Sequence, residues 1–353
     1  GQLARAAADS GGGGAASAGR TRRGAVVAAA GPWLSGGWRP AEVRAAAPAV
    51  ADSAKLGLRD RLSPDVKLVN PRLRTPAEST ESSAATYPSW LFGEWEVQSV
   101  PSAFAEPLGQ RFLDAETRAA IREDFAPGQR KEVSWRARYY SASLDVDGVP
   151  LPRGRSPGAA LTPRSSWGVV VAGPPPAGRA VRLPTPPGPV VQYRAFNAAE
   201  EVRAFLGQRV PRVISEADPR ARPLKVWIAY PENEGEEGEE GSIRTVTLTL
   251  DARSAEEGSG SFVSSELFRQ TVTTEGQVDT VGDFEVVNAY RLVDAELGRV
   301  SVRNRVAQYL AADHPLYREA GGRAVSWLDY DWAMQRTRTC IDTPYGEQCL
   351  TGV

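Results

Sequence analysis

The sequence predicts a mainly β protein, built as an antiparallel sandwich or a closed barrel. Segments in which apolar and polar residues alternate recur roughly nine times after residue 93, which is the period of strands buried on one face. The connections between them are polar and contain glycine. Helical patterns are few and short, so we expect helices only as lids or corners of the sheet.

The alternation is clearest in three segments. Trp95 and Val97 alternate with glutamates and a glutamine in "GEWEVQ", and "EVSWRARYY" places Trp135 and Tyr139 on one face. The pattern returns in "VTLTL" from Val246. Further strands are expected at 190–195, 224–230, 261–272, 284–293, 300–310 and 324–338.

One helix is expected within "NAAEEVRAFLG". Asn197 would be its N-cap, with Glu200 three residues later, and Gly207 would end it. A second short helix is expected at 114–125. Neither is long enough to form a domain of its own.

Composition narrows the class of partner. The chain has 42 basic and 43 acidic residues, which removes the broad electrostatic reason to expect nucleic-acid binding. No apolar run approaches the roughly eighteen residues of a membrane-spanning helix. We therefore expect no nucleic-acid partner and no membrane span.

Residues 1–51 have the composition of a targeting peptide. They contain six arginines and two acids among alanine, glycine and serine. Arg22 and Arg23 precede a weakly apolar stretch, and small-residue triplets at 45–47 and 49–51 resemble signal-peptidase sites. This order predicts a transit peptide followed by a twin-arginine signal, and hence the chloroplast thylakoid lumen. The alternative is a disordered Ala/Gly-rich tail.

The remaining chain divides into a linker and one domain. Residues 52–86 are polar and show no sustained period, so a disordered linker is expected. The domain would span 87–353, with inserted surface loops at 150–189, which has eleven prolines, and at 232–241. The second loop, "ENEGEEGEEG", is interpreted as a solvated hairpin tip, with calcium binding by its glutamates as the alternative.

The stretch "YPSWLFGEWEVQS" carries a resemblance to lipocalin-like barrels. In such barrels a Gly-x-Trp triplet opens the first strand, and an arginine of the last strand stacks on the indole. The triplet here is Gly93 and Trp95, and the expected last strand places Arg336 on the face of its apolar residues. The resemblance implies that these three residues close the barrel floor.

A longer resemblance covers residues 87 to about 336. The chain resembles a family of cyanobacterial and plastid lumen proteins marked by "YPSWL-x-G-x-W" and "PLG-x-RF", which are followed here by "YRAFN", "SELFRQ", "NAYRL" and "AGGRAV". The family has no assigned activity, so the resemblance implies a location and a fold but no catalytic residues.

The sequence does not predict an enzyme. His314 is the only histidine, and it is expected in a turn before Pro315. Asp329 and Asp331 share a strand face about 6.6 Å apart, a spacing that suits glycosidase chemistry, but they are expected to face solvent. No phosphate-binding, nucleophile-elbow or dinucleotide motif is present. No catalytic residue, metal site or cofactor is predicted.

The two cysteines, Cys340 and Cys349, flank a Pro-Tyr-Gly turn. In an oxidising compartment this spacing favours a disulfide that ties down the C-terminal tail. A redox-regulated thiol pair is the alternative.

Two functions follow as hypotheses. The first is binding of an apolar ligand, such as a pigment, a lipid or a quinone-like molecule, inside the barrel. The ligand-binding candidates are Trp135, Tyr139, Phe284, Asn288, Tyr290 and Trp332. The alternative to a pocket is a barrel filled by these side chains. The second hypothesis is an auxiliary or assembly factor that docks on a photosystem or another thylakoid complex. A carotenoid isomerase or epoxidase ranks third.

Overall fold

The computed structural model describes residues 57–73, 86–126, 130, 132–142, 181–183, 189–206, 212–218, 221–231, 242–275 and 277–350. The targeting segment, the acidic loop and most of the proline-rich loop lie outside the described residues, and so do the predictions made for them.

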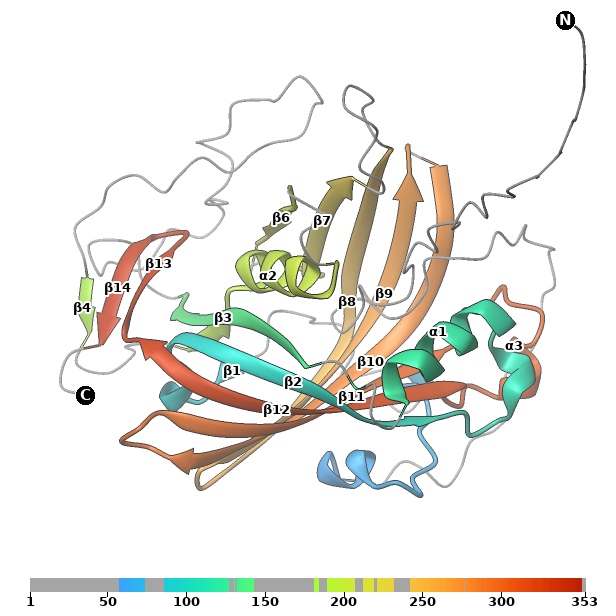
Figure 1. The fold of residues 1–353 in the computed structure, drawn as a ribbon, viewed down its shortest axis with the longest axis horizontal. Coiled ribbons are helices and arrows are strands. Elements are labelled where there is room, and N and C mark those ends of the chain that lie inside the picture. Colours follow the sequence, from blue (N-terminus) through green and yellow to red (C-terminus); the bar gives the residue numbers. More distant parts are fainter. Residues whose placement is uncertain are drawn as a thin grey trace, which may run out of the picture.

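One antiparallel sheet of eleven strands forms the body of the protein (Figure 1). Its strands are β1 (Thr86–Tyr87), β2 (Gly93–Ala105), β3 (Val133–Ser141), β5 (Val190–Gln192), β6 (Ile214–Ala217), β7 (Lys225–Pro231), β8 (Ile243–Gly258), β9 (Ser261–Thr274), β10 (Gln277–Asp294), β11 (Arg299–Tyr309) and β12 (Ser326–Arg338). Their order is β1-β5-β3-β2-β12-β11-β10-β9-β8-β7-β6. The sheet curls into a half-barrel, which confirms the predicted mainly β, antiparallel, barrel-like fold.

The sheet is not closed by strand pairing in the part of the chain that the structure describes, because β1 and β6 are its two edges. Helix α2 (Arg194–Leu206) lies between β3 and the β6–β7 side of the curl (Figure 1). Ala198, Ala199 and Val202 are buried in the same core as the strands. The helix thus occupies the place that a closing strand would have.

Asn197 is not the N-cap of this helix, as the sequence suggested. The helix begins at Arg194, so the strand expected at 190–195 ends at Gln192. Asn197 lies inside the first turns, where its Oδ1 accepts a hydrogen bond from the backbone N of Arg138, at 2.7 Å, and its Nδ2 donates to the same residue's carbonyl. Its side chain therefore ties the helix to β3.

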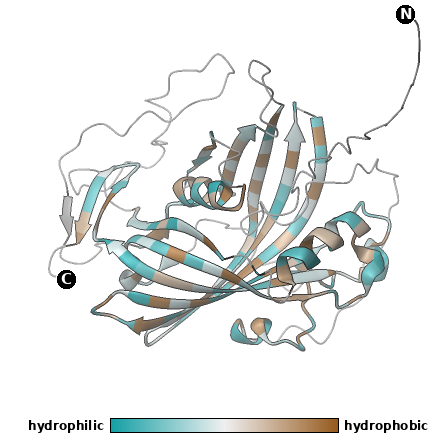
Figure 2. Cartoon of the chain, in the orientation of Figure 1, coloured by the Kyte–Doolittle hydropathy of each residue, from teal (hydrophilic) through white to brown (hydrophobic). Residues whose placement is uncertain are grey.

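Alternation along the strands produces two buried faces. Figure 2 shows apolar and polar bands along the strands. The concave face carries the largest core cluster, in which Trp95, Trp135, Phe268 and Tyr290 pack with α2. The convex face carries smaller clusters, in which Val263 and Leu267 take part.

The convex face is covered by residues 57–73, which the sequence assigned to a disordered linker. They include two short 3-10 helices, η1 (Arg59–Leu62) and η2 (Pro71–Leu73), and buried Leu62 and Leu68. Arg61 is 1% exposed and forms an ion pair with Glu285, which is fully buried. Because a buried charge needs its partner, this segment is fixed on the sheet.

The remaining elements lie at the ends of the sheet. Helix α1 (Ala115–Phe125) appears where it was expected, capped by Asp114, whose Oδ1 accepts from the backbone N of Thr117 at 2.7 Å. A short helix, α3 (Tyr317–Ala320), precedes β12. None of the helices in the described part of the chain has the length and apolar character that a bilayer crossing requires.

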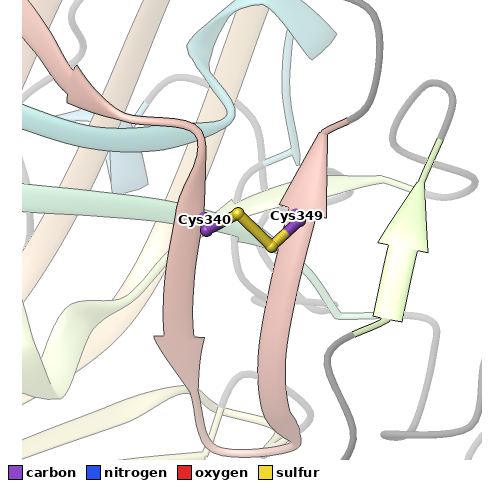
Figure 3. The surroundings of a disulfide bond; sticks show 2 residues. All are labelled: Cys340 and Cys349. Atoms are coloured by element: carbon purple, nitrogen blue, oxygen red, sulfur yellow. A yellow bond between two sulfur atoms is a disulfide. The ribbon is translucent and has the colours of Figure 1, made fainter.

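A small second sheet holds the disulfide. Strands β13 (Cys340–Thr343) and β14 (Gly346–Leu350) form a hairpin, and β4 (Val181–Leu183) pairs in parallel with β14. Cys340 and Cys349 are directly opposite in register and are joined by an S–S bond of 2.12 Å (Figure 3). The predicted disulfide is confirmed.

Candidate functional site

The concave face brings together all six side chains predicted to bind a ligand. Trp135 and Tyr139 come from β3, Phe284, Asn288 and Tyr290 come from β10, and Trp332 comes from β12. The first five are less than 9% exposed, and Trp332 is partly exposed. The alternation in these strands therefore predicted that the six residues share one face of the sheet.

These aromatic side chains contact one another. The rings of Trp135 and Trp332 have their centroids 5.4 Å apart in an edge-on arrangement, and the hydroxyls of Tyr139 and Tyr290 are 3.3 Å apart. Phe284 stacks on Phe268 of β9 at 5.6 Å. Part of the concave face is therefore filled by the protein itself.

A third tyrosine completes a buried hydroxyl cluster. Tyr87 of β1 lies edge-on to Tyr139, with ring centroids 5.1 Å apart, and to Tyr290 at 6.0 Å. Burial raises the pKa of all three phenols, so they remain neutral hydrogen-bonding groups over the physiological range. Tyr87 belongs to the "YPSWL" motif, which the sequence analysis interpreted only as a family signature.

Beside the tyrosines is an ion pair that sequence reasoning missed. Arg194, the first residue of α2, forms an ion pair with Glu266 of β9, and its guanidinium lies 5.6 Å from the ring centroid of Phe268. Burial opposes the charge of Arg194, yet the adjacent Glu266 raises its pKa overall. The pair places a guanidinium and a carboxylate, which balance each other's charge, in the aromatic interior.

Glu201, one helical turn further along α2 than Asn197, is a further titratable group near Arg194 and Tyr139. Burial raises the pKa of its carboxyl to about 8, although Arg194 lowers it. The carboxyl is therefore mostly protonated at pH 7 and acts as a hydrogen-bond donor.

Several polar atoms on the concave face are buried without a partner. They are Nε2 and Oε1 of Gln270, Oδ1 of Asn304, Nε2 of Gln308 and Nε1 of Trp332. The strand register places all four residues on the face that carries Phe268, Val306 and Tyr330. A buried donor or acceptor without a partner costs roughly 1–3 kcal/mol, so groups of this kind indicate a place where a polar molecule completes the bonding.

The face has free space beside these groups. Gly282 is the register partner of Gln270, and a Cβ built on it would meet no atom within 4 Å. Val286 and Trp332, which face the same interior, keep partial exposure. The concave face from Gln270 to Trp332 is therefore the candidate ligand region; these two residues lie eight register positions apart, about 26 Å along the strands, with Val286 between them.

Asn288, one of the predicted ligand-binding residues, already has a hydrogen-bond partner within the protein. Its Oδ1 accepts a hydrogen bond of 2.7 Å from Nδ2 of Asn304, which leaves the Oδ1 of Asn304 unpaired. The amide free to meet a ligand in this pair is thus that of Asn304.

The predicted floor of the half-barrel is present. The Arg336 guanidinium lies 4.8 Å from the ring centroid of Trp95, and the two residues are register partners between β12 and β2. Gly93 has φ +123°, and a Cβ there would lie 2.7 Å from the carbonyl oxygen of Arg338. Only glycine fits this strand start without strain.

The carboxylates considered for catalysis do not form a pair. Asp329 accepts two hydrogen bonds of 2.6 Å from Arg305, so it does not face solvent freely as expected, while Asp331 is exposed. His314 lies in a turn, as predicted, and its Nδ1 accepts from the backbone N of Leu316 at 3.1 Å. Burial lowers the pKa of His314.

Comparisons with family models, with curated proteins and with solved structures find no match to this chain. The resemblance to the lumen family therefore stays a prediction.

Proposed function

We propose that the concave face binds an apolar ligand with a polar end, held between the curled sheet and α2. Candidates are a pigment, a lipid or a quinone-like molecule. The observation that carries this proposal is the set of unpartnered polar atoms on Gln270, Asn304, Gln308 and Trp332 among buried aromatic rings. Pockets for small molecules combine such apolar walls with a few polar groups that fix orientation.

The donors in the site favour a ligand that accepts hydrogen bonds. The amide of Gln308 and the indole of Trp332 each have a free N–H, and Glu201 carries a proton at pH 7. A carbonyl oxygen on an otherwise apolar skeleton, as in a quinone-like molecule, would accept from one of these donors at a time, because Gln308 and Trp332 lie six register positions apart, about 20 Å along the strands. The aromatic pairs Trp135–Trp332 and Phe268–Phe284 would contact the skeleton.

The test is extraction followed by reconstitution. Protein isolated from its native source is extracted for pigments, lipids and quinones, and a plain ubiquinone analogue is then titrated into the emptied protein while tryptophan fluorescence is followed. We expect quenching with saturation, and loss of binding in Gln270→Leu and Gln308→Leu. Gln98→Leu, at an exposed position of β2, is the matched control. Repeated isolation with no bound compound, together with no quenching, would overturn the proposal.

A second proposal concerns partners and place. The basic, acid-poor segment 1–51 supports delivery to the chloroplast thylakoid lumen, where the protein would act as an auxiliary factor on a photosystem or another thylakoid complex. Expression of the first 51 residues fused to a fluorescent protein tests the location. Crosslinking and affinity purification test the partner, and recovery of no photosynthetic subunit would exclude this role.

A further inference from the structure

A groove of about 470 Å³ lies on the outside of the sheet, next to the turn that joins β8 to β9. Three arginines line it, namely Arg59 of η1, Arg291 of β10 and Arg303 of β11. The rest of its wall includes small residues and hydroxyls, namely Ser259, Gly260, Ser261, Ala289 and Ser301, together with Tyr290 and Leu292 of β10. Of the residues named for the concave face only Tyr290 lines it, and neither Trp95 nor Arg336 of the barrel floor does.

The arginines converge because of the strand register. Arg291 has Ser261 on one neighbouring strand and Ser301 on the other as its direct partners. Arg303 is the diagonal neighbour of Arg291, at roughly 7–8 Å between such positions. Arg59 reaches the same place from the covering segment and donates to Oγ of Ser261 at 2.7 Å. Small side chains between the guanidiniums leave room for an anion.

The charges of the groove are not neutralised by the protein. Within the described residues, none of the three arginines forms an ion pair. The nearest carboxylates by register are Asp331, opposite Arg303, and Glu256, which accepts a hydrogen bond from the backbone N of Leu58 at 2.9 Å. Arg303 donates only to the carbonyl of Leu62, at 3.3 Å. Three arginines beside these two carboxylates leave a formal net charge of +1, and Arg291 has only serines, Ser261 and Ser301, directly opposite it.

Apolar side chains stand beside these charges. Val293, two residues after Arg291 on β10, is 61% exposed, and Leu297 in the turn that follows is 54% exposed. Exposed aliphatic residues next to arginines are the combination by which proteins bind the interface of an anionic bilayer. Val293 and Leu297 are two of seven exposed large hydrophobic residues in the described part of the chain, and the register puts Val293 at the groove end of β10.

We propose that the groove binds the phosphate of an anionic lipid headgroup, with Val293 and Leu297 entering the boundary between headgroups and acyl chains. The guanidiniums of Arg59, Arg291 and Arg303 supply hydrogen bonds and charge to the phosphate. The protein would thereby rest on a membrane surface through the outside of its β10–β11 end. This surface is separate from the concave ligand site, and neither proposal depends on the other.

The experiment is vesicle co-sedimentation with the full chain. We expect binding to vesicles of phosphatidylcholine and phosphatidylglycerol that weakens as salt rises, and no binding to phosphatidylcholine alone. The double variant R291Q/R303Q should lower the affinity about thirtyfold, on the basis of the usual contribution of an arginine near an anionic surface. V293S/L297S should also lower it.

Matched controls separate the groove from general charge and apolarity. R111Q/R122Q removes two exposed arginines, one shortly before α1 and one within it, each of which forms an ion pair, and V278S/V281S removes two valines that are 63% and 43% exposed at the other end of β10. Both should bind as the parent does. Equal binding to neutral vesicles, equal loss in the control variants, or binding of inorganic phosphate without any binding of anionic vesicles would each overturn the proposal. Thermal unfolding of every variant shows whether it is folded.

Discussion

Arg336 of β12 stacks on Trp95 of the adjacent strand β2, and each of these two side chains also donates a hydrogen bond to a backbone carbonyl of the "YPSWL" segment. Nε1 of Trp95 donates to the carbonyl of Leu91 at 2.7 Å, and Nη2 of Arg336 donates to the carbonyl of Trp90 at 2.5 Å. The "YPSWL" segment is thus held in place by one side chain of β2 and one of β12. Trp95 therefore has a structural role at the floor of the half-barrel and is not part of the candidate ligand site.

Replacement of Arg336 should therefore destabilise the fold without changing ligand binding. Arg336→Met removes the cation–π contact and the hydrogen bond to Trp90, and we expect a loss of about 1–3 kcal/mol in the free energy of unfolding. Urea denaturation measures it. Arg338→Met, on the same strand but 64% exposed, is the control and should cost less than half as much. An equal cost at both positions would contradict the role given to Arg336.

The covering segment should be required for stability. Arg61→Met leaves Glu285 buried and unpaired, which typically costs about 3–5 kcal/mol. The double variant Arg61→Met, Glu285→Met should recover much of that loss, because apolar residues of similar size replace both charges. Chemical denaturation of both variants checks this. If Arg61→Met were neutral, residues 57–73 would not be bound to the sheet as described.

The disulfide should stabilise the C-terminal hairpin by restricting the unfolded chain. Ser replacement of Cys340 and Cys349 together should lower the free energy of unfolding by about 2–3 kcal/mol, as the chain-entropy model gives for so short a loop. Thermal unfolding with and without a reducing agent checks the value. The reducing agent should shift the parent protein and leave the double variant unchanged; a shift in both would show a different redox effect.

Stability should fall as pH rises because of Glu201. Its pKa is about 8 in the fold and 4.5 in the reference state, so the folded protein binds the proton more tightly than the unfolded chain between these values. The contribution is complete below about pH 4.5 and is lost as pH rises toward 8. Glu201→Gln should match the parent at pH 5 and exceed its free energy of unfolding by several kcal/mol at pH 9, because each pH unit between the two pKa values contributes about 1.4 kcal/mol.

The control for this pH profile is the neighbouring carboxyl. Glu200→Gln removes an acid that pairs with Arg136 and Arg203 at the surface of α2. Its unfolding midpoint should keep the parent's dependence on pH between 5 and 9. A flat profile in the parent protein would show that Glu201 is charged in the fold.

The period of apolar residues predicted those features of the fold that depend on residues close together in the sequence, such as which face of a strand a side chain occupies. Alternation placed Trp95, Trp135 and Tyr290 on one buried face, because successive side chains of a strand point to opposite sides. It failed for Arg61, whose partner Glu285 is 224 residues away, since no local pattern reports so distant a contact. The capping pattern at Asn197 gave a wrong prediction for the same reason, because the side-chain amide of Asn197 bonds to the backbone of Arg138 in β3 and does not cap the helix.

The candidate site was predicted in its apolar half only. Gln270 is an even number of residues from Phe262 and Phe268 on β9, so the same alternation that turns these two phenylalanines inward also predicts an inward position for Gln270. Arg194 and Glu201 carried no such signal. Their position depends on how α2 packs against β3, β6 and β7, and no local sequence pattern reports such tertiary contacts.

Helix α2, between β3 and β6, makes the width of the half-barrel interior depend on side-chain contacts as well as on strand pairing. A barrel closed by hydrogen-bonded strands has a circumference fixed by strand number and tilt. Here the seam consists of side-chain bonds, in which Asn197 reaches β3 and Ser215 of β6 donates to the carbonyl of Ala195 in α2. Substitution of a few residues on one helix face can therefore widen or narrow the interior while every strand ladder stays intact.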